Sequence, residues 1–139
     1  MKALLVAPAA ACVALLGPLP GPPPALADPG YSPPFVDHTE WAQWGGRPSL
    51  RVFPTPSGRL AARQPGTAAL ADEAWAEVLA KSPDADTPGM RAQFDCHWQF
   101  AELAQPGKTS WNLEPWRPVV DDQTMVRTRC NPGDAEEPF

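Results

Sequence analysis

The sequence has few of the residues that most metal sites and nucleic-acid interfaces require. Its 139 residues include two histidines and three cysteines, whose spacing matches no structural zinc pattern, so we predict no metal and no cofactor. The 11 basic residues do not cluster and are outnumbered by 16 acidic ones. This balance argues against nucleic acid or an anionic membrane surface as a partner.

The N-terminal segment predicts export. Lys2 is followed by an apolar run over 3–16, then by Gly17-Pro18, and 25–27 reads Ala-Leu-Ala, a small-x-small cleavage site. We therefore predict a signal peptide over 1–27 and a secreted product, extracellular or associated with the cell wall. The run is short for a bilayer span, so we expect no transmembrane segment in the mature chain. Cys12 lies in this run without a lipobox, which makes a lipoprotein the weaker alternative.

The segment 87–104 predicts a buried central helix. Thr87 is a suitable N-cap and Pro88 suits the first helical position. Most side chains are apolar, but Gln93 and His97, four residues apart, fall inside the apolar arc. An unpaired buried amide or imidazole costs about 1–3 kcal/mol, so both should have partners. Those partners are either protein groups of a nearby loop or, if His97 acts as acid, base or ligand contact, a bound molecule.

Cys96 and Cys130 are the two cysteines left after cleavage at Ala27. An even cysteine count in an exported chain favours a disulfide over two free thiols. This bond would fasten the central helix to the C-terminal segment and stabilise the fold by roughly 3–4 kcal/mol.

The rest of the chain predicts one α+β domain over 44–132, with two helices packed on a small, mostly antiparallel sheet and one disulfide. Trp41 and Trp44 are three apart, so one helical turn would place them on one face, either as a hydrophobic plug on the core or as an exposed aromatic platform that stacks on sugars or a partner. Glu73 and Glu77 should belong to a solvated helix face. We expect a proline-rich extended lead-in over 28–43, a strand over 48–55, a loop over 60–66, a helix over 68–81, a hairpin over 119–129 and a loosely held acidic tail over 133–139.

The stretch 111–118, WNLEPWRP, mixes aromatic and polar residues more densely than any other part of the chain. If this loop folds onto the central helix, His97 and Glu114 could act as base and orienting carboxylate. The candidate binding residues are Gln93, His97, Trp111, Asn112, Glu114, Trp116 and Arg117.

Several motifs together resemble a known family. They are SLRVxPT over 49–55, Gly58-Arg59, Trp75, QFDCH over 93–97, WNLEPWRP over 111–118 and CNP over 130–132. In this order they resemble a family of secreted actinobacterial proteins catalogued as domain of unknown function 2599, over about 44–132. The resemblance implies export and a cysteine pair, and it implies no established activity.

Three hypotheses for the function follow. The first is a non-catalytic module that binds an unknown polymer or protein of the cell envelope, because aromatic faces bind sugars, peptides and proteins. The second is a small secreted hydrolase that uses His97 and Glu114. The third is structural: the 111–118 loop caps the central helix, and Glu114 or Arg117 satisfies Gln93 or His97.

Overall fold

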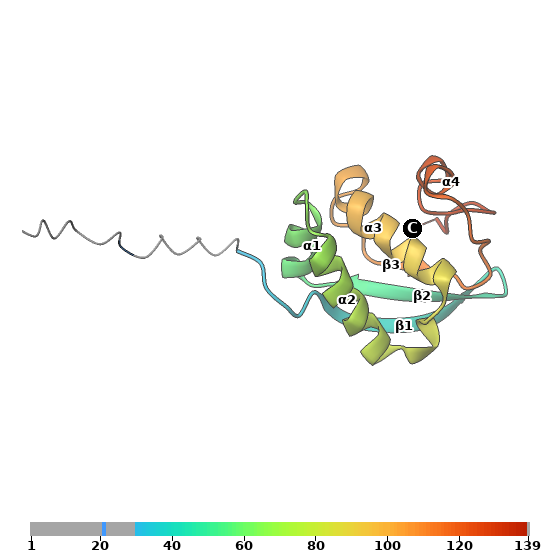
Figure 1. Ribbon diagram of the computed structural model, residues 1–139. Coiled ribbons are helices and arrows are strands. Elements are labelled where there is room, and N and C mark those ends of the chain that lie inside the picture. Colours follow the sequence, from blue (N-terminus) through green and yellow to red (C-terminus); the bar gives the residue numbers. More distant parts are fainter. Residues whose placement is uncertain (1–20, 22–29, 139) are drawn as a thin grey trace, which may run out of the picture.

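An antiparallel sheet in the order β1-β2-β3 carries α2 and α3 on one face (Figure 1). The computed structural model describes residue 21 and residues 30–138, so the predicted signal peptide lies outside the described residues except for Gly21. The α+β class, the antiparallel sheet and the disulfide are confirmed. The elements are β1 (Val36–Trp44), β2 (Arg47–Pro54), α1 (Pro56–Ala62), α2 (Ala68–Lys81), the 3-10 turn η1 (Pro83–Ala85), α3 (Pro88–Ala104), β3 (Trp111–Leu113) and α4 (Asp122–Arg127).

Helix α3 begins and ends where the sequence predicts. The Thr87 hydroxyl accepts a hydrogen bond from the Met90 amide at 3.2 Å, which satisfies one of the free donors of the first turn. Arg91 pairs with Asp95 across one turn at 2.9 Å. Both contacts are local, which is why they could be predicted from residue spacing alone.

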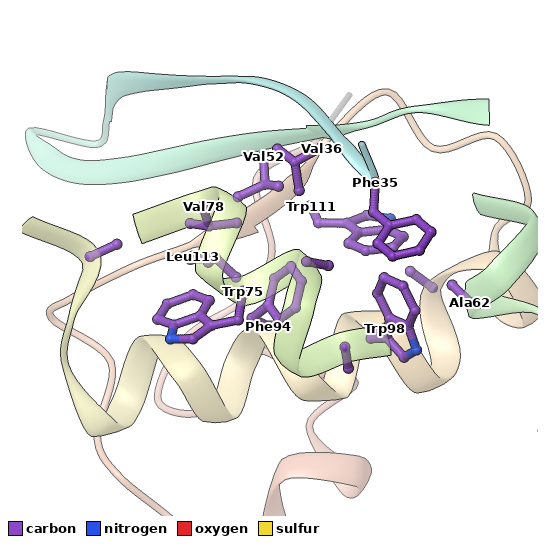
Figure 2. Close-up of a cluster of buried hydrophobic side chains, with 14 of the residues drawn as sticks. Phe35, Val36, Val52, Ala62, Trp75, Val78, Phe94, Trp98, Trp111 and Leu113 are labelled. Atoms are coloured by element: carbon purple, nitrogen blue, oxygen red, sulfur yellow. The ribbon is translucent and has the colours of Figure 1, made fainter. Parts of the chain in front are cut away.

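The core lies between α3 and the sheet and is largely aromatic (Figure 2). The Phe94 ring centroid lies 5.3 Å from that of Trp75, 6.2 Å from Trp98 and 6.1 Å from Trp111. Leu50 of β2, which alternates with polar neighbours, is fully buried against this cluster. Large rings at these separations explain how so small a domain fills its interior.

Strand β1 corrects the prediction for the N-terminal part of the domain. Residues 36–43 belong to a strand paired with β2, not to an unpaired lead-in, and Trp41 and Trp44 do not share a helical turn. The turn that joins the strands is Gly45-Gly46, with φ of 58° and 77°. Such a turn requires positive φ at both central positions, which glycine adopts without strain.

Two short helices also differ from prediction. The segment after Thr55 is α1 and not a loop, and the Thr55 hydroxyl caps it by accepting from the Gly58 amide at 2.9 Å. The expected C-terminal hairpin is wrong, because α4 begins at the cap residue Asp121, whose carboxylate accepts from the Thr124 amide at 2.7 Å. Helices this short show little periodicity, so the caps were their main signal.

Two acidic helix residues make long-range contacts, and for one of them, Glu77, this corrects the prediction of a solvated face. Glu77 accepts hydrogen bonds from the backbone amides of Phe35 and Val36, at 2.8 Å and 2.7 Å, and so holds the start of β1 on α2. Glu102 is buried and pairs with Arg59 of α1 at 2.5 Å. Both contacts join distant segments, so helical periodicity alone does not reveal them.

The disulfide joins Cys96 in the middle of α3 to Cys130, just after α4. Met125 of α4 packs beside it. The bond therefore fixes the C-terminal segment on the side of α3 that does not face the sheet.

Reduction of the Cys96–Cys130 bond should lower stability. It opens a loop of 34 residues, which in the chain-entropy relation is worth about 4 kcal/mol. We expect a clearly lower melting temperature in excess reductant, and the same decrease in the variant Cys96→Ala/Cys130→Ala without reductant. Equal melting temperatures for the oxidised and reduced protein would contradict a stabilising role for the bond.

Candidate functional site

The Gln93 side chain is hydrogen-bonded to the backbone of Glu114. Its Nε2 donates to the Glu114 carbonyl and its Oε1 accepts from the Glu114 amide, both at 2.9 Å. Gln93 is fully buried. Its side-chain amide donates one hydrogen bond to the Glu114 backbone and accepts one from it, as a paired residue on a neighbouring strand would. The expectation that a loop group satisfies the buried amide is confirmed for Gln93.

The Glu114 side chain and Arg117 form a buried ion pair. One Glu114 carboxylate oxygen accepts from Arg117 Nε at 2.7 Å, and the other accepts from the Ser49 hydroxyl at 3.0 Å. The Arg117 guanidinium also donates to the carbonyls of Pro132 and Asp134, at 3.2 Å and 2.6 Å. Both charges are thus paired and hydrogen-bonded, the condition under which a buried ion pair is tolerated.

His97 is buried with one side of its ring bound to its own helix. Its Nδ1 lies 2.8 Å from the Gln93 carbonyl, which can only accept, so Nδ1 carries the proton and Nε2 the lone pair. Burial lowers the pKa of His97 to about 4, although the Gln93 carbonyl acts in the opposite direction, and the nearby positive charges of Lys108 and Arg117 lower it further. The imidazole is therefore neutral at pH 7.

The structure does not pair His97 with the Glu114 carboxylate. His97 stacks on Trp111, whose ring lies on the core face of β3 together with Leu113. Side chains alternate along a strand, so Asn112 and Glu114 point to the opposite face, where Glu114 meets Ser49. Among the described residues, the base and orienting-carboxylate pair of the hydrolase hypothesis is not assembled.

The tryptophans of the 111–118 loop do not form an exposed platform, whereas Trp41 of β1 is 40% exposed. Trp111 is 1% exposed, and half-buried Trp116 donates its indole N–H to the Pro48 carbonyl at 3.1 Å. The Arg47 guanidinium lies 3.6 Å from the Trp116 ring centroid, and that of Arg117 lies 4.4 Å away. Cations already cover this ring, which leaves less of it for stacking on a sugar.

The acidic tail is bound to the domain, which corrects the expectation that it is loosely held. Asp134 pairs with Arg47 at 2.7 Å, Glu137 pairs with Arg51 at 2.8 Å, and Glu136 pairs with Lys108. Sequence reasoning missed these pairs because each joins residues far apart in the chain.

A pocket of about 550 Å³ opens beside His97 and is called the Lys108 pocket below. Its walls come from the second half of α3, the end of α4, the disulfide and the tail. A cavity of similar size, about 600 Å³, lies near Arg63 and Leu103 and contains none of the predicted site residues. The Lys108 pocket is lined by Cys96, His97, Phe100, Ala101, Ala104, Gln105, Lys108, Val126, Arg129, Cys130 and Glu136.

Within residues 30–138, no three histidine, cysteine or acidic side chains gather as a metal site would require. None of the helices in the same part of the chain has the length and apolar character to cross a bilayer.

The buried imidazole should make stability depend on pH. The unfolded chain protonates His97 with an ordinary pKa of 6.5, and the folded chain does so only near pH 4, so protonation favours unfolding. Denaturant titrations should show about 2 kcal/mol less stability at pH 5 than at pH 7 from this residue alone. His97→Asn should remove most of this slope, and His38→Asn, which replaces an exposed histidine, should retain it. A slope unchanged by His97→Asn would contradict the assignment.

Comparison with known proteins places the chain in a family. Residues 36–133 match the family described as protein of unknown function (DUF2599), so the match begins at β1, earlier than the motifs alone suggested. Uncharacterised proteins of Mycobacterium tuberculosis and Mycobacterium bovis are 61% identical over 149 aligned residues, covering 100% of both chains. One of Mycobacterium leprae is 56% identical over 108 residues, covering 78% of this chain and 87% of its own length. No solved structure matches. The chain belongs to the DUF2599 family.

Proposed function

We propose that this chain is an exported, non-catalytic module that binds a polymer or protein of the cell envelope. The apolar run over 3–16 and the Ala-Leu-Ala site support export. The Cys96–Cys130 bond adds support, because disulfides persist mainly in oxidising compartments outside the cytoplasm.

The observation that carries the binding role is the Lys108 pocket. It combines a buried lysine, an exposed arginine and a histidine ring with an apolar wall, which is the usual composition of a ligand site. The other polar residues of the predicted site support this role indirectly. Gln93, Glu114 and Arg117 are committed to hydrogen bonds that hold the pocket walls together.

The hydrolase hypothesis has weaker support from the same geometry. His97 Nδ1 is bound to a backbone carbonyl and not to a carboxylate, and both cysteines of the described domain are in the disulfide. His97 is thus oriented by a neutral carbonyl, and neither a carboxylate nor a free thiol of the described domain joins it as a catalytic partner.

Cell fractionation of an actinobacterial host that produces the full chain tests the proposal. We expect the oxidised protein, beginning at Asp28, in the wall fraction. Lys108→Met should move it to the culture fluid, because it removes the buried cation of the pocket. Lys81→Met is the matched control, since Lys81 is an exposed lysine at the end of α2, and it should leave the distribution unchanged.

Two results would count against the proposal. Recovery from the cytosol with Met1 retained and reduced cysteines would contradict export. The same distribution for the wild type and Lys108→Met would contradict retention through the pocket.

A further inference from the structure

Two cations adjoin the Lys108 pocket, and they differ in their partners. The Lys108 side chain is 6% exposed and is paired with Glu136 of the tail. Arg129 is exposed, and within residues 30–138 no hydrogen bond or ion pair engages its guanidinium. One positive charge of the pocket is thus held by the tail, and the other is available to a solute.

The backbone conformation at Arg129 is one that an arginine rarely adopts. Arg129 has a φ of 53°, and Cys130 follows with 67°, at the end of α4 where glycine is the usual residue. A side chain in this left-handed region costs about 1 kcal/mol relative to glycine. An arginine at such a position is therefore unfavourable for the backbone, and a contribution of its side chain to the pocket would explain it.

The remaining wall of the pocket is apolar and partly exposed. Phe100 of α3 is 38% exposed and Val126 of α4 is 50% exposed, and Ala104 and the disulfide lie beside them. A short hydrocarbon group in the pocket would cover part of this surface, which is favourable at about 25 cal/mol per Å².

The carboxylate of Glu136, a residue of the tail, occupies the position beside Lys108. The Glu136 side chain is 34% exposed, although the carboxylate oxygen that faces Lys108 is itself buried, so a ligand must displace this oxygen to reach the lysine. Its neighbours are held separately, Asp134 by Arg47 and Glu137 by Arg51. Glu136 can therefore leave Lys108 without release of the whole tail.

We propose that the Lys108 pocket binds an organic monocarboxylate with a short apolar chain, and that Glu136 is its internal competitor. The ligand carboxylate lies between Lys108 and Arg129, and its chain lies against Phe100 and Val126. The exposed apolar wall of Phe100 and Val126 favours a carboxylate that carries a hydrocarbon chain over an inorganic anion such as phosphate, which has no apolar surface to bury. This inference rests on the proposed binding function and specifies its ligand class.

Titration of the purified, oxidised domain with hexanoate, followed by amide chemical shifts in NMR spectra, tests the inference without the cell envelope. Hexanoate should shift the amides around Lys108 and Arg129, and hexanol and inorganic phosphate should bind at least about tenfold more weakly. Glu136→Gln should tighten hexanoate binding about fivefold or more, because the competing charge is gone. Arg129→Gly should weaken it by a similar factor while the melting temperature stays equal or rises.

Matched variants separate the pocket from general charge effects. Glu137→Gln removes a neighbouring tail charge that pairs with Arg51, and Arg127→Ala removes an arginine of α4 outside the pocket. Both should leave hexanoate affinity unchanged. Equal binding of hexanoate and hexanol, no shifts near the pocket, or unchanged affinity in Glu136→Gln or Arg129→Gly would overturn the inference. Hexanoate binding by a protein that is not retained in the wall fraction would contradict only the envelope role.

Discussion

The reciprocal hydrogen bonds between the Gln93 side chain and the Glu114 backbone are the contact on which the rest of the arrangement depends. β3 is short and has a single strand neighbour, β2, so its end needs another partner. The buried amide of α3 supplies both a donor and an acceptor there, which leaves neither backbone group of Glu114 unpaired. This contact fixes the distance between the central helix and the edge of the sheet.

A chain of buried polar contacts starts from that point. With its backbone fixed, Glu114 directs its carboxylate at Ser49 and Arg117. Arg117 in turn binds the carbonyl of Pro132, just before the tail, and that of Asp134 within it. Removal of any one member would leave a buried charge or donor without a partner, which is costlier than the net gain from forming the bond. The network therefore holds the tail in place and, through it, the position of Glu136 at Lys108.

The sequence was most informative where the interactions are local. The periodicity of α2 and α3 and the N-cap of α3 predict those helices, and the cysteine count predicts the disulfide. The same reasoning indicates that Gln93 and His97 are buried polar residues in need of partners and names Glu114 as a candidate partner. It does not reveal that the Glu114 backbone, and not its side chain, bonds Gln93, because the two residues are 21 positions apart. Nothing in the sequence predicts that Lys108 is buried, because a lone lysine before a short strand is normally exposed. The Gly45-Gly46 pair is the sequence signal for β1, because two adjacent glycines favour a tight turn between paired strands.

Hydrogen exchange at the Glu114 amide tests the central claim most directly. If the Gln93 side chain accepts this N–H throughout the native ensemble, the amide should exchange only through global unfolding, as slowly as the amides in the middle of α3 near Phe94. Its protection should also disappear in Gln93→Ala, while the amides of α2 keep theirs relative to the new global stability. Exchange of the Glu114 amide in the wild type as fast as that of an amide in an unfolded chain would contradict the account.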